Sequence, residues 1–327
     1  MSLAIPLIRA GVLSPIFRWA TDHCKDIDQL LSAADLAYAS EIDIHELVPL
    51  RSAVLLLSLI AETEGPDIAW RVSASSDIEE LGLIGRAAMA TTTPREALSA
   101  ISRNMSKHCS HELIEVRQTP TGMIIGEGWT IRFEQEIHHY IQQYVTSLVY
   151  SIFRLTGADE AFFKHVSMVP HPKYGLAHLA PWLHVQPAAS VDGYLRIEVE
   201  SQWANRAFAK PPELSGSVHV DSNADVIDPA LENTARTVLK LHMMAGKPSV
   251  DRLVRVAGCS RRTLQRALAE RGATFQSLLE DVRQEVGTAE LLQGKLSRAD
   301  IAVRLGYSRQ STLSHAIRRW KGRRSIS

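Results

Sequence analysis

Cysteine is scarce in this chain, and features of several common protein classes are missing. Three cysteines occur among 327 residues, a number that is small, odd and typical of a reducing cytoplasm rather than of a disulfide framework. The most apolar run, Ala53 to Ala61, has about half the length of a membrane-spanning helix. No basic residue precedes Arg9, so we predict no secretory signal. We expect a cytoplasmic protein with no membrane association.

Signatures of catalysis are also missing. The sequence contains no Gly-x-Ser-x-Gly elbow and no glycine-rich Lys-Ser/Thr phosphate loop. One cluster of potential metal ligands, His108-Cys109-Ser110-His111 with Glu112, lacks the second cluster that would complete four ligands at a familiar spacing. We therefore predict no catalytic residue, no metal site and no cofactor.

Charge is distributed unevenly, although the formal net charge is zero. Residues 241–327 carry 17 Lys and Arg against 7 Asp and Glu, whereas residues 1–240 carry 19 against 29. A basic segment joined to an acidic one is typical of a nucleic-acid-binding module on a partner domain. Between them, residues 211–225 are rich in small polar residues without helical period. We predict domains at 1–210 and 226–327, with a linker at 211–225.

The first domain is expected to mix helices and strands. Helical spacing of apolar residues occurs in 27–37, 50–61, 77–89 and 134–155. Thr93 is predicted to cap a helix in which Pro94 occupies the first turn. Two β-rich runs, 112–118 and 123–133, flank a Pro-Thr-Gly hairpin signal, and 164–169 and 194–199 have the composition of further strands. This predicts an α+β fold.

The second domain is predicted to be all-α, and one pattern occurs in it twice. Gly258 and Gly306 are 48 residues apart, as are Ser260 and Ser308. Glycine allows a tight turn between crossed helices because it takes a positive φ angle at little cost, and the serine is predicted to cap the second helix. Each copy is therefore predicted to be a helix-turn-helix, which places a helix in the DNA major groove.

A single helix is predicted between the two copies. Residues 275–293 fit one continuous helix, with Thr274 as its N-cap and Gly294 as its stop. Its length is about 28 Å. This length could separate the second helices of the two helix-turn-helix units, here called the reading helices, by a distance close to the ~34 Å between successive major grooves on one face of DNA. We predict two helix-turn-helix units joined by a linker helix.

Polar residues on the outward faces of the reading helices are the candidate DNA contacts. Arginine pairs bidentately with guanine and glutamine with adenine, while other contacts hold only phosphates. The predicted contacts are Arg261, Arg262, Gln265, Arg266, Arg309, Gln310, Ser311, Ser314, His315 and Arg319.

Four motifs follow one another in this basic segment, namely Ser260-Arg-Arg-Thr-Leu-Gln-Arg266, Gly272-Ala-Thr-Phe275, Ile301-Ala-Val-Arg-Leu-Gly-Tyr-Ser308 and Arg319-Trp-Lys-Gly322. In this order they resemble the AraC family of bacterial transcription regulators. The resemblance implies base-directed roles for Arg262, Gln265, Arg266, Gln310, Ser311, Ser314 and His315. The family usually has arginine where His315 stands.

Two stretches of the first domain, 85–98 and 166–172, resemble the arabinose-binding-type effector domain of a subset of these regulators. The resemblance implies ligand sensing and dimerisation. Aromatic and cationic side chains are the candidate contacts, although helical packing explains the tyrosines equally well. The predicted effector contacts are Trp70, Arg71, Arg132, His139, Tyr140 and Tyr144.

Paired arginines leave the class of effector open. Arg262 with Arg266, and Arg319 with Arg323, lie one helical turn apart and could grip a phosphorylated effector such as a cyclic dinucleotide. DNA phosphates explain both pairs more simply.

The sequence thus predicts a ligand-responsive, sequence-specific transcription regulator. We expect a homodimer whose partners are double-stranded promoter DNA and a small-molecule effector. Two alternatives stay open. One is a thiol-dependent enzyme with Cys109 as nucleophile and a DNA-binding tail, and the other is a constitutive architectural DNA binder.

Overall fold

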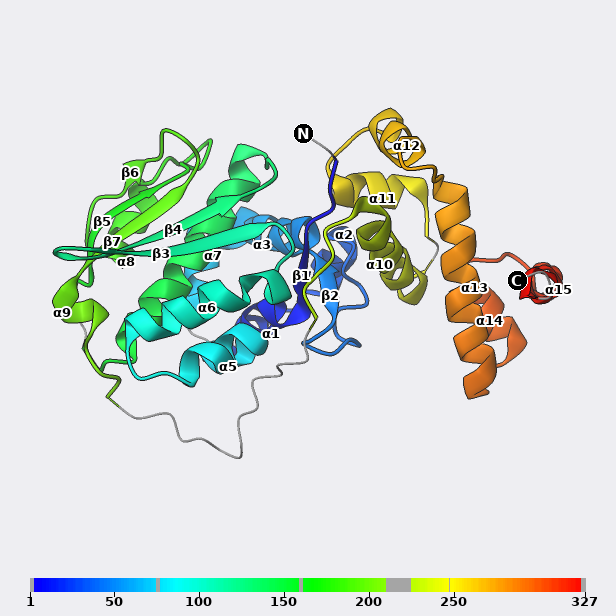
Figure 1. The fold of residues 1–327 in the computed structure, drawn as a ribbon, viewed down its shortest axis with the longest axis horizontal. Helices are drawn as coiled ribbons and strands as arrows, with labels where there is room; N and C mark the ends of the chain where they lie inside the picture. The colour runs from blue at the N-terminus through cyan, green and yellow to red at the C-terminus, as the bar shows by residue number, and fades with distance from the viewer. Residues whose placement is uncertain (1–2, 75–76, 159–160, 210–224, 247, 325–327) are drawn as a thin grey trace. The chain divides into compact units, whose positions relative to one another are not determined.

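The computed structural model describes residues 3–74, 77–158, 161–209, 225–246 and 248–324 (Figure 1). They form two compact units. The N-terminal unit consists of Leu7–Ala34 and Ile42–Ile227, and the C-terminal unit consists of residues 228–327 together with 1–6 and 35–41. The predicted linker lies outside the described residues except for Asp225. No described helix is both long and apolar enough to cross a membrane.

A five-stranded sheet in the order β3-β4-β7-β5-β6 forms one layer of the N-terminal unit. Its strands are β3 (Glu112–Thr119), β4 (Gly122–Trp129), β5 (Phe163–Met168), β6 (Ala188–Ala189) and β7 (Leu195–Glu200). All neighbours are antiparallel except β5 and β6. The predicted hairpin is confirmed, with Thr119 opposite Gly122. A separate small sheet pairs β1 (Leu7–Arg9) with β2 (Leu47–Pro49).

Helices complete the N-terminal unit, and α6 and α7 lie beside the sheet in Figure 1. The longer helices are α1 (Ser14–Asp22), α3 (Leu50–Glu64), α6 (Pro94–His108) and α7 (Gln135–Arg154). The shorter ones are η1 (Ala10–Leu13), α2 (Asp28–Ala33), α4 (Ile68–Ala74), η2 (Ile78–Leu81), α5 (Leu83–Met89), η3 (Ala177–Leu179), α8 (Ala180–Leu183) and α9 (Ser201–Ala204). The unit therefore has the predicted α+β fold.

Local signals set several of these boundaries. The Thr93 hydroxyl accepts a hydrogen bond from the backbone N–H of Glu96 at 3.3 Å and caps α6, with Pro94 at its first position as predicted. The helix predicted over 77–89 is instead divided into η2 and α5. Gly82 stands at the break with φ +66°, a conformation that ends one helical run and redirects the chain.

Much of α7 is buried, and part of its buried surface is polar. Phe153 packs with Ile125 and Ile197 of the sheet in one apolar core. Gln142 and Gln143 on α7 are also fully buried. Gln142 accepts a hydrogen bond from the backbone of Val169 at 2.7 Å, and Gln143 accepts one from that of Trp70 at 3.0 Å. Buried polar groups cost free energy unless they are paired. These two hydrogen bonds therefore hold α7 against α4, which contains Trp70, and against the segment after β5, which contains Val169.

Six helices make up the main part of the C-terminal unit as far as its residues are described. They are α10 (Leu231–Met244), α11 (Val250–Ala257), α12 (Arg261–Ala269), α13 (Phe275–Gln293), α14 (Arg298–Arg304) and α15 (Gln310–Arg324). The bounds of α13 match the predicted linker helix. Thr274 and Ser277 form a capping box at its start, and Gly294 ends it with φ +65°.

Gly85 in α5 provides a test of packing in the N-terminal unit. A Cβ at this position would overlap the carbonyl oxygen of Ile78, so that the backbone of η2 or α5 would have to move. We expect Gly85→Ala to lower the free energy of unfolding by at least about 2 kcal/mol. Urea unfolding followed by circular dichroism measures this change. The matched control is Arg86→Ala on the half-buried next position, and equal unfolding midpoints for the two variants would contradict the packing argument.

Candidate nucleic-acid interface and ligand cavity

Helices α11 and α12 form the first helix-turn-helix. Gly258 ends α11 with φ +61°, in the left-handed region that glycine enters without strain. The Ser260 hydroxyl accepts a hydrogen bond from the backbone N–H of Thr263 at 3.1 Å, which confirms it as the N-cap of α12. Leu264 and Leu268 are fully buried, and they therefore fix which face of α12 is turned to solvent.

The predicted contacts on α12 all lie on that solvent face. The exposed residues are Arg261, Arg262, Gln265 and Arg266. Arg261 forms a bidentate ion pair with Asp251 of α11, and Arg266 lies 3.8 Å from Glu270. Among the described ion pairs none involves Arg262. Its guanidinium is thus the most available of the three arginines for an external partner.

Helices α14 and α15 form the second helix-turn-helix. Ser297 caps α14 by accepting a hydrogen bond from the backbone of Asp300, and Gly306 follows with φ +74°. The second copy has one more residue after its serine than the first, and α15 begins only at Gln310. Ser308 therefore lies one residue before the cap position, and its predicted role as N-cap is wrong.

The predicted contacts of the second unit lie at and after the start of α15. Exposed residues are Arg309, Gln310, Ser311, His315 and Arg319, and Ser314 is half-buried. Arg309 precedes the helix, and the Ser314 hydroxyl donates to the carbonyl of Gln310 at 3.3 Å. Arg319 is held by Glu280 of α13. Arg323, its suggested partner in gripping phosphates, lies outside the residues whose side chains the structure describes.

An acidic residue far away in the sequence also positions the first helix-turn-helix. Asp35 belongs to the segment 35–41 of the C-terminal unit. Its carboxylate accepts hydrogen bonds from Arg252 Nε at 3.0 Å and from an Arg255 terminal nitrogen at 2.9 Å, both on α11. Asp35 is 6% exposed, and the neighbouring Leu36 and Tyr38 are buried. Nothing in the local sequence marks Asp35 for this contact.

This double ion pair gives a testable stability effect. In Asp35→Asn, the two guanidinium groups lose their shared counter-charge. We expect a loss of about 2 kcal/mol, less than for a fully buried pair because Arg255 is largely solvated. Thermal unfolding of the full-length protein measures it. Asp251→Asn removes an arginine pair whose two side chains are each 58% exposed and should leave the midpoint nearly unchanged. A shift as large as that of Asp35→Asn would refute the special role of burial.

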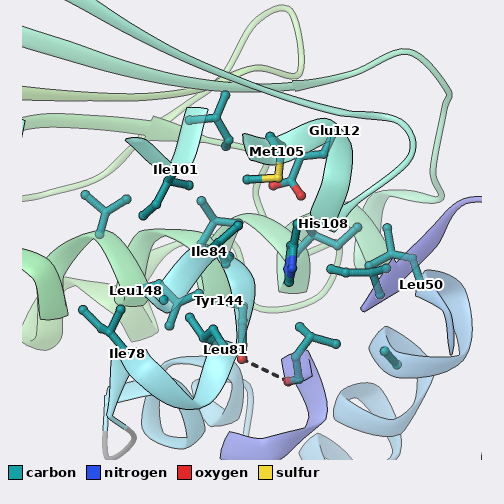
Figure 2. Close-up of a pocket in the computed structure, with 18 of the residues that line it drawn as sticks. Leu50, Ile78, Leu81, Ile84, Ile101, Met105, His108, Glu112, Tyr144 and Leu148 are labelled. Atoms are coloured by element: carbon teal, nitrogen blue, oxygen red, sulfur yellow. Dashed lines mark hydrogen bonds between the residues drawn. The ribbon is translucent and has the colours of Figure 1, made fainter. Parts of the chain in front are cut away.

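The N-terminal unit contains an apolar cavity of about 100 Å³ (Figure 2). Its walls come from β1, η1, α1, α3, η2, α5, α6, the β3–β4 hairpin and α7. Tyr140 and Tyr144 are the two predicted effector contacts that line it. The Tyr144 hydroxyl donates to the carbonyl of Val12 at 3.1 Å, shown as the dashed line in Figure 2.

The other four predicted effector contacts lie elsewhere. Trp70 packs against the rings of Tyr150 and Trp182. Arg71 pairs with Asp67 at 3.3 Å, and Arg132 is exposed. His139 is buried and lies with its Nε2 3.2 Å from that of His178. Trp70 and His139 share Gln143 as a neighbour, and Arg71 and Trp182 share Asp67, but none of the four residues lines the cavity.

Two cavity residues were missed as ligand contacts and had instead been weighed as metal ligands. His108 ends α6, Glu112 begins β3, and both side chains point into the cavity (Figure 2). Burial lowers the pKa of His108 to about 3 and raises the pKa of Glu112, so both groups favour their uncharged forms at neutral pH. In the described residues no group of three potential metal ligands converges.

Cys109 stands between these two residues but has the wrong environment for a nucleophile. It is 1% exposed, and its burial raises the pKa of the thiol well above the usual range. Reactive cysteines are partly exposed and have lowered thiol pKa values. The surroundings of Cys109 therefore speak against the thiol-dependent alternative.

Comparison with known proteins agrees with both units. A model described as a helix-turn-helix domain matches residues 253–324, and the N-terminal arabinose-binding domain of AraC transcription regulators matches residues 25–166. The HTH-type transcriptional regulator VirS of Mycobacterium tuberculosis is 26% identical over 278 residues, covering 82% of this chain and 80% of VirS.

Shorter matches cover only part of the chain. An uncharacterized HTH-type transcriptional regulator of M. tuberculosis, Rv1395, is 44% identical over 61 residues, covering 19% of this chain and 18% of its own. The ornithine utilization regulator of Pseudomonas aeruginosa is 33% identical over 76 residues, 23% and 22% of the two chains. Among solved structures, the transcriptional regulator CdpR of P. aeruginosa matches at a TM-score of 0.43 with 18% identity, covering 95% of both chains.

The two units define a transcriptional regulator with a ligand-binding domain and a helix-turn-helix DNA-binding domain. The matched models occur in the order found in such regulators, and the similarity to VirS extends across both. The chain is therefore similar to AraC-type transcription regulators, with a match to their N-terminal arabinose-binding domain followed by a match to a helix-turn-helix domain.

Proposed function

We propose that this protein is a sequence-specific regulator whose promoter binding responds to a small molecule held in the apolar cavity. The observation that carries the proposal is the cavity itself. It lies in the unit that matches the ligand-binding domain, and it presents His108 and Glu112 among apolar walls. Effector sites are typically apolar with a few oriented polar groups.

Exposed side chains of the reading helices support sequence-specific binding. Arg262 and Gln265 lie on the solvent face of α12, and both types of side chain read purine edges in the major groove. Arg261 and Arg319 are engaged with acidic neighbours, which suits them to orient the surface rather than to read bases. In the second unit, Gln310, Ser311 and His315 are the exposed candidates for base contact.

A ligand can alter promoter binding only as far as it binds one arrangement of the protein better than another. We infer that ligand occupancy changes the placement of the DNA-binding units of a homodimer. The test is binding of the full-length protein to DNA upstream of its own gene and of neighbouring operons, against random DNA, across a salt series. Site-specific binding that an effector shifts would support the proposal. Specific binding that no effector alters would leave a constitutive DNA binder.

Arg262 offers a direct test of base recognition. We expect Arg262→Ala to lose about 1–3 kcal/mol of discrimination at one base pair while other positions keep their preference. Fluorescence anisotropy with a selected site and its single-base variants measures this. Arg262→Lys is the matched control, because it keeps the charge but not the bidentate geometry. If lysine restores full discrimination, or if alanine weakens all sites equally, Arg262 holds a phosphate instead.

A further inference from the structure

The chemistry of the cavity restricts what it can bind. Among the described lining residues there is no lysine and no arginine. Arg9, whose charge contributes to the lowered pKa of His108, does not line the cavity, and it donates from Nε to the carbonyl of Lys107 at 2.6 Å. A negatively charged group entering the cavity would therefore meet no cation there to compensate for its lost hydration.

Most polar atoms around the cavity are already engaged. The Tyr144 hydroxyl is bonded to Val12, and the Trp129 indole N–H donates to Glu127. The Tyr140 hydroxyl lies 3.5 Å from His171 Nε2, a histidine that does not line the cavity. Among the described lining side chains, His108 and Glu112 are the two further polar groups that could recognise a ligand.

His108 has one ring nitrogen without a hydrogen-bond partner among the described residues. Its side chain is 3% exposed, and its Nδ1 is buried without a hydrogen-bond partner among the described residues. A buried polar atom without a partner costs free energy comparable to a lost hydrogen bond. A ligand that supplies the missing bond recovers that cost, so His108 favours a ligand with a hydrogen-bonding group over a pure hydrocarbon.

Glu112 complements His108 from the start of β3. Its carboxyl interacts with the Cys109 thiol and also lines the cavity. The carboxyl is 8% exposed and has buried Glu127 as an acidic neighbour. Burial and this neighbour favour the protonated carboxyl. A protonated carboxyl can donate a hydrogen bond to an uncharged oxygen as well as accept one.

We propose that the cavity selects a small, uncharged, mostly apolar molecule with one oxygen function, such as an alcohol, ketone or lactone, whose oxygen lies between His108 and Glu112. This inference rests on the proposed function in taking the cavity as the effector site. The volume of about 100 Å³ is below the ~150 Å³ of an engineered cavity that accepts benzene, so the cavity suits a compact ligand.

Calorimetric titration of the full-length protein tests the proposal. The probes are straight-chain alkanols from butanol to decanol, with the alkanoate and alkylammonium ion of each length. We expect saturable binding of at least one alkanol. Its matched ions should bind at least about a hundredfold more weakly, because each would bury an uncompensated charge. Equal or tighter binding of either ion, or no saturable binding of any alkanol, would overturn the proposal.

Three variants locate the binding. His108→Leu should weaken alkanol binding roughly tenfold by removing one hydrogen bond. Glu112→Gln keeps an uncharged polar group of the same shape and should change affinity little. Ala53→Leu, on the α3 wall of the cavity, should abolish binding by filling the space without touching either polar group. If His108→Leu fails to fold, Ala53→Leu still decides the site, since unchanged binding there would place the alkanol elsewhere.

The same samples separate this inference from the proposed function. Promoter binding is measured by anisotropy with and without the saturating alkanol. Alkanol binding that is lost in Ala53→Leu but never alters promoter binding would uphold the cavity chemistry and refute ligand control of DNA binding. A charged probe that occupies the cavity and shifts promoter binding would refute the proposed cavity chemistry and uphold ligand control of DNA binding.

Discussion

At Gly287 the linker helix α13 carries no side chain, and two residues of the second helix-turn-helix pack against its backbone. A Cβ there would lie 3.0 Å from the Trp320 indole and 2.9 Å from the Leu305 methyl. Trp320 also donates its indole N–H to Glu280 of α13 at 3.1 Å. Glycine within a helix costs about 1 kcal/mol relative to alanine, and the close approach of the buried indole offsets that cost.

The same helix also meets the first half of the C-terminal unit. Asp281 and Glu285 on α13 pair with Arg236 and Lys240 on α10, each at 2.7 Å. Helix α10 contacts α11, and α11 contacts α12. Both reading helices, α12 and α15, are therefore positioned relative to α13. Asp35 adds a further tie to α11. The spacing of the two DNA-reading faces therefore depends on packing along α13.

How far the sequence could predict the structure differs between the two units. The caps at Thr93, Ser260 and Thr274 and the β3–β4 hairpin were predictable, because each depends on residues within a few positions. The break at Gly82 divides a continuous helical pattern, since apolar periodicity alone does not report a backbone reversal. The extra residue before α15 likewise moved the helix start past Ser308.

The candidate effector site could not be predicted in the same way. Tyr140 and Tyr144 were recognised from their helical spacing, and both line the cavity. The sequence indicated His108 and Glu112 only as possible metal ligands. Their position beside an apolar cavity depends on the packing of α3, α5 and α7 around them. Trp70 and Arg71 have the right chemistry for a ligand site but face other partners.

The sequence by itself determined the order of the elements, the two helix-turn-helix units and the polar face of α12, because capping, turn formation and amphipathic spacing act over a few residues. The tertiary structure decided which polar groups remain available. It engaged Arg261 and Arg319 with acidic partners and brought Asp35 to α11 across more than 200 positions. It also left His108 Nδ1 without a hydrogen-bond partner among the described residues. Burial and pairing arise from contacts between distant segments, and no local pattern encodes them.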